Sequence, residues 1–189
     1  MQITENHTIQ LLIERCKENN AKAQKSLYQL FAGKMFAICL RYAKDHMAAE
    51  DILQTGFVKI FSSIGKFRSE GSFEGWLRRI MVNTAIEHYR YSVKLQQTAE
   101  ITNEVEASTG ETVLSELALE DLLQLIARLP DGYRIVFNMY VIEGFSHKEI
   151  AIKLGISEGG SKSQLSRAKQ MLKTALIKRE EVEYEQYRK

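Results

Sequence analysis

The sequence predicts an all-α protein with two small helical domains, an N-terminal helical bundle and a C-terminal four-helix domain with a helix-turn-helix, joined by a flexible acidic linker. Three observations predict this architecture. Apolar residues recur every three or four positions in several separate stretches, which is the period of a half-buried helix. Pro130 is the one proline of the chain, so helices meet few breaks. Between Ser92 and Gly110 large apolar residues become sparse and polar and acidic residues replace them, which is typical of a linker.

The N-terminal domain is predicted over residues 1–91. Helices are expected where the apolar period is found, near residues 9–16 and over residues 24–42, 47–64 and 72–89. Ser72 is placed to cap the last of these helices, because a serine side chain accepts a hydrogen bond from an amide of the first turn. The intervening segment 65–71 holds two glycines and several polar residues, which predicts a loop.

The linker is predicted over residues 92–115, the C-terminal domain over residues 116–179 and a polar tail over residues 180–189. The C-terminal domain begins with an apolar helical stripe, which consists of Leu119, Leu122, Leu123, Ile126 and Leu129. Pro130 and Asp131 end this helix and start the next one. Two further helices follow, and the inward face of the last one is expected to hold Leu165, Ala168, Leu172 and Leu176.

Residues 144–169 read GFSHKEIAIKLGISEGGSKSQLSRAK and carry the most specific local pattern of the chain. Ser146 and Glu149 have the spacing of a capping box, which starts a helix. Gly155 suits the left-handed backbone conformation that ends a helix, and Ser157 can cap a second helix. A short helix, a tight turn and a basic second helix together predict a helix-turn-helix.

The second helix of this motif is predicted to read duplex DNA, because such helices enter the major groove with their N-terminal half against the base edges. The candidate DNA-contacting residues are Ser157, Lys162, Ser163, Gln164 and Arg167. Arginine and lysine suit guanine edges or phosphates, and glutamine suits adenine. The alternative is an ordinary helical hairpin with a solvated basic face.

Charge is segregated along the chain in a way that fits a polyanionic partner. Residues 22–92 hold 11 basic and 6 acidic side chains, residues 93–116 hold 1 and 5, and residues 117–179 hold 10 and 6. Two basic blocks thus flank an acidic strip. Ordinary solvation of two domains explains the same layout, so the charge pattern does not decide between these interpretations.

No catalytic, metal or cofactor site is expected. The four histidines lack paired ligand spacing, and the two cysteines, Cys16 and Cys39, are expected to be free thiols in a reducing compartment. No phosphate-binding or dinucleotide-binding glycine motif occurs. The sequence shows neither a secretory signal layout nor an apolar run long enough to cross a membrane, so a cytoplasmic protein without membrane insertion is expected.

Three segments resemble the sigma-70 family of RNA polymerase sigma factors, and especially its small extracytoplasmic-function type. Residues 129–151, LPDGYRIVFNMYVIEGFSHKEIA, together with the helix-turn-helix, resemble the family's fourth conserved region. In the second conserved region, residues 51–59, DILQTGFVK, resemble the part that binds polymerase. Residues 66–83, KFRSEGSFEGWLRRIMVN, resemble the part that melts and reads the −10 element. The resemblance extends over residues 23–90 and 119–176, with the family's order and spacing.

The resemblance implies a factor that binds core RNA polymerase, directs it to promoter DNA and helps to open the −10 element, with the helix-turn-helix reading the −35 element. The implied −10 contacts are Phe67, Arg68, Ser69, Trp76, Arg79 and Asn83. The implied contacts to core polymerase are Asp51, Gln54 and Phe57. Trp76 also lies on an apolar stripe, where a core position is the alternative. Asp51 also lies near a helix N-terminus, where an acidic group offsets the helix dipole.

Family members commonly have threonine at position 160 and often valine at the next position, whereas this chain has Gly160 and Ser161. Glycine costs about 1 kcal/mol in a helix interior, so a less rigid start of the recognition helix is expected. An anti-sigma protein is a further implied partner. Two other functions stay open. A stand-alone helix-turn-helix regulator would need no melting segment, and a sigma-like decoy would bind polymerase or an anti-sigma protein without promoter activity.

Overall fold

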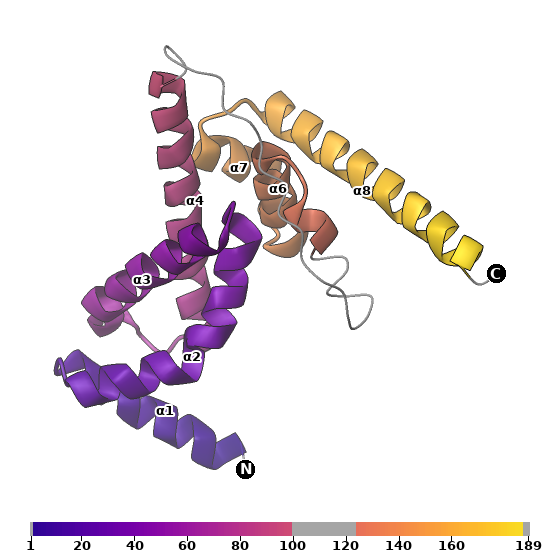
Figure 1. The fold of residues 1–189 in the computed structure, drawn as a ribbon. Coiled ribbons are helices and arrows are strands. Elements are labelled where there is room, and N and C mark those ends of the chain that lie inside the picture. Colours follow the sequence, from indigo (N-terminus) through magenta and orange to yellow (C-terminus); the bar gives the residue numbers. More distant parts are fainter. Residues whose placement is uncertain (1, 100–123, 187–189) are drawn as a thin grey trace. The chain divides into compact units, whose positions relative to one another are not determined.

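The described residues of the computed structural model, 2–99 and 124–186, form helices and connecting loops, and no β-strand occurs among them (Figure 1). The chain divides into two compact units, Met1–Tyr91 and Ser92–Lys189. These findings confirm the predicted fold class. Most of the predicted linker, residues 100–115, lies outside the described residues, and so do Leu119, Leu122 and Leu123 of the predicted apolar stripe.

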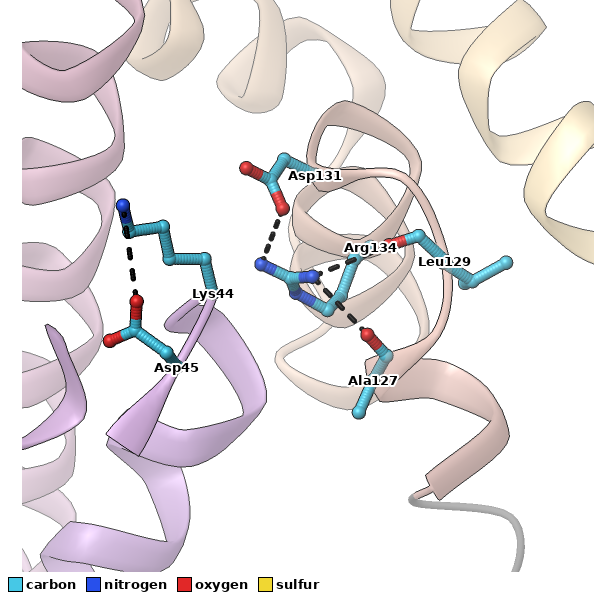
Figure 2. Close-up of polar contacts among 6 residues, drawn as sticks. All are labelled: Lys44, Asp45, Ala127, Leu129, Asp131 and Arg134. Atoms are coloured by element: carbon cyan, nitrogen blue, oxygen red, sulfur yellow. Dashed lines mark hydrogen bonds and ion pairs between the residues drawn. The ribbon is translucent and has the colours of Figure 1, made fainter. Parts of the chain in front are cut away.

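Unit 1 is built from four α-helices and a short 3-10 helix. They are α1 (Gln2–Lys17), α2 (Ala21–Tyr42), α3 (His46–Ser63), η1 (Ile64–Lys66) and α4 (Phe73–Ala99). Side-chain caps begin three of the helices: Asn20 accepts a hydrogen bond from the Ala23 amide at 3.0 Å, Asp45 from the Ala48 amide at 2.8 Å, and Ser72 from the Gly75 amide at 3.0 Å. The predicted cap at Ser72 is therefore confirmed. Figure 2 shows Asp45 beside Lys44, with 3.9 Å between the charged atoms.

The core of unit 1 is a continuous apolar interior between these helices. α2 packs against both α1 and α3. Its buried apolar residues follow the predicted helical period: Leu27, Phe31, Met35, Ile38 and Tyr42. Gly56 of α3 lies against the buried Met81 side chain of α4, which an added Cβ would overlap. A larger residue at position 56 would therefore displace Met81.

Unit 2 consists of α6 (Asp131–Phe137), the π-helical turn η2 (Asn138–Ile142), α7 (His147–Leu154) and α8 (Glu158–Gln186), preceded by helical residues 124–127. α8 packs against α6 and α7. The small core of unit 2 is formed by Ile126, Leu129, Ile135, Val136, Met139, Ile150, Leu165, Ala168 and Leu172.

Two boundaries and one core residue differ from the sequence prediction. α4 continues to Ala99, so residues 92–99 of the predicted linker are helical. α8 continues to Gln186, so most of the predicted polar tail is helical as well. Both segments lack glycine and proline and are rich in residues of high helix propensity. Leu176, predicted to face inward, is 42% exposed because it lies beyond the last buried residue of α8, Leu172.

A buried arginine joins two successive helices of unit 2. Arg134 of α6 is 4% exposed, and its guanidinium forms an ion pair with Asp131 at 2.8 Å. The same group donates hydrogen bonds to the carbonyls of Ala127 and Leu129, both at 3.3 Å (Figure 2). The last carbonyls of a helix have no partner within it, so Arg134 supplies donors where the helix ahead of Pro130 ends.

Replacing Arg134 with methionine should lower the free energy of unfolding of unit 2 by about 3 kcal/mol, because the carbonyls of Ala127 and Leu129 lose their donor and Asp131 loses its counter-charge. Denaturant unfolding of the full chain, followed by circular dichroism, measures the loss. Trp76 fluorescence, which reports unit 1, should keep its midpoint. The exposed Arg128→Met serves as the matched control and should change stability by less than about 0.5 kcal/mol. An equal effect of both substitutions would contradict the assignment.

Both cysteines are free and buried in unit 1, as predicted. Burial raises the pKa of Cys39 to about 12 and also raises the pKa of Cys16. Since the thiolate is the reactive form, neither thiol should react with iodoacetamide at pH 8 in the folded protein, and labelling should follow the unfolding curve. The Cys16→Ala variant reports Cys39 alone. Rapid labelling of that variant without denaturant would show that Cys39 is not protected.

The raised pKa of Cys39 also makes the stability of the fold depend on pH. The folded state holds the thiol proton more tightly than the unfolded state does. This contribution is fully present below the ordinary thiol pKa of 9.0 and is lost as the pH rises toward about 12.

Candidate nucleic-acid interface

α7 begins with the predicted capping box. The Glu149 carboxylate accepts hydrogen bonds from the Ser146 hydroxyl at 2.7 Å and from the Ser146 amide at 2.8 Å, and the Ser146 hydroxyl accepts from the Glu149 amide at 3.3 Å. These bonds from Ser146 favour the ionised carboxylate and so lower the pKa of Glu149, and the positive charge of Lys153 acts in the same direction. The start of the helix-turn-helix is therefore fixed by its own side chains.

The turn between α7 and α8 also has the predicted geometry. Gly155 adopts φ 70° and ψ 33°, in the left-handed region that suits glycine. The amides of Gly155 and Ile156 both donate to the Ala151 carbonyl, at 2.9 and 3.1 Å. The Ser157 hydroxyl accepts from the Gly160 amide at 2.9 Å and caps α8. The helix-turn-helix is confirmed, and the hydroxyl of Ser157 is engaged in it.

The N-terminal half of α8 has one buried face and one exposed face. Leu165, Ala168 and Leu172 are buried. On the opposite side, residues spaced by three or four positions form an exposed surface, which we call the α8 reading face: Gly159, Ser163, Ser166, Arg167 and Gln170. Of the predicted contacts, Ser163 and Arg167 lie on this face, exposed Lys162 and half-buried Gln164 flank it, and Ser157 caps the helix.

Besides Gly159, which has no side chain, sequence reasoning missed two members of the α8 reading face, Ser166 and Gln170. Both follow Ser163 at helical spacing, so the same period would have identified them if it had been continued for two turns. Arg167 is held in place by α6, because its Nη1 atom donates to the Tyr133 hydroxyl at 3.1 Å. This contact raises the pKa of the guanidinium. A charged donor group is thus fixed on the face.

The loop between η1 and α4 carries three of the predicted −10 contacts. Arg68 and Ser69 are exposed, and Ser69 has φ 59°, a conformation that residues other than glycine seldom adopt. Phe67 is only 9% exposed, with ring centroids 5.1 Å from Phe73 and 5.5 Å from Trp76. The ring packs under the loop in this position, and its role as a −10 contact stays a prediction.

Trp76 is packed against the core on one part of its surface and exposed on another, so both roles that the sequence left open stay compatible with its position. Its ring stacks on Phe73 with 5.6 Å between centroids, yet the residue is only half-buried. Arg79 and Asn83 follow it at spacings of three and four, which places all three residues on one side of α4. Arg79 is exposed and Asn83 is half-buried. The structure therefore brings an aromatic ring, a cation and an amide together along one helix face.

The exposed side of α3 holds two of the three predicted polymerase contacts. Asp51 and Gln54 are exposed, whereas Phe57 is 3% exposed and packs against Tyr28 and Phe61. Phe57 packs in the core of unit 1, and its role as a polymerase contact stays a prediction. Met47 and Val58, 77% and 69% exposed, share the helical spacing of Asp51 and Gln54 and were missed.

Comparison with known proteins assigns both units to one family. The family model described as sigma-70 region 2 matches residues 27–94, and the model described as sigma-70, region 4 matches residues 119–172. Together the two matches take up more than half of the chain.

Curated relatives match over nearly their whole length. The chain is 27% identical to the RNA polymerase sigma-H factor of Pseudomonas aeruginosa, over 88% of this chain and 93% of that protein. It is also 27% identical to the ECF RNA polymerase sigma-E factor of Escherichia coli, over 90% and 95%. Among solved structures, the sigma factor RpoE of Bartonella quintana in complex with the anti-sigma factor NepR matches with a TM-score of 0.51 and 22% identity, over 81% of this chain and 96% of that one.

The capping box generates a prediction with a defined pH dependence. Glu149 has a lowered pKa in the folded state, so its charge stabilises folding above its ordinary pKa of 4.5, and this contribution is lost as the pH falls through the folded value. Glu149→Gln keeps a hydrogen-bonding side chain and removes the charge. Wild type should be more stable than this variant at pH 7, and the difference should shrink as the pH falls below 4.5. A difference that is independent of pH in thermal unfolding would refute the role of the charge.

Proposed function

This chain belongs to the sigma-70 family of RNA polymerase sigma factors, of the extracytoplasmic-function type, and from that premise we propose how its two units divide the work of directing the polymerase to promoters. Unit 2 reads duplex DNA at the −35 element through α8. Unit 1 binds core polymerase through α3 and captures the opened −10 element through the η1–α4 loop and α4. The observation that carries this proposal is the α8 reading face, which a capped helix-turn-helix leaves exposed.

The α8 reading face has the chemistry that base recognition in the major groove requires. Arg167 supplies two parallel donors for guanine, and Gln170 offers the donor and acceptor pair that suits adenine. Ser163 and Ser166 add short hydroxyl groups, and Lys162 at the edge suits a phosphate. We propose these five residues as the −35 contacts of the chain, with Ser157 in a capping role.

Unit 1 has groups suited to holding unstacked bases. Opening a duplex costs a few kcal/mol for each flipped base, and stacking on aromatic rings with contacts from basic residues offsets that cost. Trp76 is half-buried and retains exposed area, while Arg68, Ser69 and Arg79 are exposed around it. We propose these residues, with Asn83, as the −10 contacts. Phe67 acts through the loop that it anchors.

The exposed side of α3 is the proposed polymerase surface. Met47 and Val58 contribute apolar area on either side of Asp51 and Gln54, and a surface with an apolar part and polar partners is typical of a protein interface. An anti-sigma protein is a further proposed partner, since the solved sigma factor that this fold resembles is bound to one. The work of the chain is binding rather than catalysis, and its proposed location is the cytoplasm, where RNA polymerase acts. No described helix is long and apolar enough to span a membrane.

Reconstitution tests the function and its alternatives together. The purified chain is added to sigma-free core polymerase, and transcripts from genomic DNA are sequenced. Discrete start sites with a shared upstream motif support the proposal. Duplex binding without polymerase would indicate a stand-alone regulator, and polymerase binding without start sites would indicate a decoy.

Two arginine substitutions should separate the roles of the units. Arg167→Ala should weaken binding of the holoenzyme to the upstream duplex about tenfold, because one good base contact is worth about 1–3 kcal/mol. Arg79→Ala should reduce permanganate reactivity of the opened −10 bases and leave upstream binding unchanged. Lys178→Ala on α8 and Lys25→Ala on α2 replace exposed cations outside these surfaces and are the matched controls. If each arginine variant impaired both steps equally, the proposed division would be wrong.

A further inference from the structure

Ser161, in the first turns of α8, is fully buried although it is polar. Its exposed fraction is 0%, and its hydroxyl lies 2.8 Å from the Nδ1 atom of His147, the first residue of α7. A buried hydroxyl without a partner is costly, so this hydrogen bond is a requirement of the site. It joins the two helices of the helix-turn-helix fourteen residues apart in sequence.

The contact lies in the first turn of α8, whose start is capped by Ser157. Gly159 and Gly160 come directly before Ser161, and glycine leaves the backbone with the largest conformational freedom. The next buried side chain of α8, Leu165, is one turn further along. Ser161 therefore joins the first turn of α8 to α7 through a directional hydrogen bond.

His147 is itself held by a third element. Its ring stacks on Tyr140 of η2, with 4.4 Å between centroids and an interplanar angle of 23°. The Lys169 ammonium of α8 lies 6.0 Å from the centroid of the same Tyr140 ring. The histidine is thus fixed by stacking on one side and bonded to Ser161 on the other. Because a serine hydroxyl can donate or accept, the hydrogen bond is compatible with either role of Nδ1.

We propose that the His147–Ser161 pair is a positioning device that sets how the N-terminal half of α8 lies on DNA, and so determines how strictly the −35 bases are discriminated. The pair touches no part of the α8 reading face. It acts through the backbone of residues 159–163, because a shift of the first turn moves Ser163 relative to a base edge. This inference rests on the proposed function of α8.

The test separates the hydrogen bond from the ring stacking. His147→Phe keeps a ring on Tyr140 and loses the bond, whereas His147→Asn keeps a hydrogen-bonding atom near the Nδ1 position and loses the ring. Ser161→Ala removes the hydroxyl. The readout is the ratio of holoenzyme affinities for the best upstream duplex and for duplexes with single base-pair changes, since loss of helix stability alone lowers both affinities and leaves the ratio unchanged.

His147→Phe and Ser161→Ala should each lower this ratio about fivefold, the effect expected for loss of one neutral hydrogen bond. The double variant should lower it no further, because both changes break the same contact. His147→Asn should retain more than half of the wild-type ratio. Hydrogen exchange of α7 and α8 in the holoenzyme confirms that each variant is folded.

Two failures of the experiment are distinguishable. If Arg167→Ala weakens upstream binding while the pair variants leave the ratio at the wild-type value, the positioning role is wrong and the proposed function stands. If Arg167→Ala is also without effect, α8 is not the reading helix, and the proposed function fails with the inference. A double variant twice as impaired as either single variant would also overturn the pairing.

Discussion

The anchoring of α8 by its buried face is the constraint on which the rest of unit 2 depends. Leu165, Ala168 and Leu172 are held by α6 and α7, so the side chains across the helix point to solvent. A helix that presents polar groups to a ligand contributes little to its own folding, and its stability comes from the apolar contacts on the opposite side. Recognition and folding are therefore divided between two faces of one helix.

Because the apolar core of unit 2 is small, polar contacts contribute much to the positioning of its helices. Arg134 satisfies the carbonyls where the helix before α6 ends, Tyr133 holds Arg167, and His147 holds Ser161. Apolar contacts tolerate sliding, whereas hydrogen bonds are directional and fix a register. In unit 2 the apolar core provides the free energy of folding, and the polar contacts determine where α8 lies within that core.

The sequence predicted those features of the fold that depend on neighbouring residues. Apolar periodicity located the helices, and the spacing of Ser146, Glu149 and Gly155 predicted the capping box and the turn, because each of these features is made within a few residues. The ends of α4 and α8 were predicted too short, since loss of an apolar stripe does not stop a helix that lacks glycine and proline. The candidate −35 face was identified only in part. Continuing the helical period of three to four residues beyond Ser163 would also have identified Ser166 and Gln170.

Contacts between different helices could not be predicted from the sequence. The burial of Phe57 and Phe67 depends on which partner helix covers them, and an aromatic residue in a functional segment reads equally well as a contact or as a core residue. The interpretation of Gly160 and Ser161 shows the same limit. These two residues predicted a less rigid start of α8, and the histidine that meets Ser161 lies fourteen residues earlier in sequence, at the first residue of α7.

The proposed function gives the two units two different states of DNA to bind. In unit 1 Phe67 and Phe73 support a half-buried Trp76 beside exposed Arg68 and Arg79, which suits flexible, unstacked bases that adapt to a partly apolar surface. In unit 2 the exposed groups are polar and stand on a rigid helix, which suits the fixed base edges of a duplex. Since unstacked bases can move to meet the protein and duplex edges cannot, the demand for exact positioning falls on α8, where the Arg167 and Ser161 contacts lie.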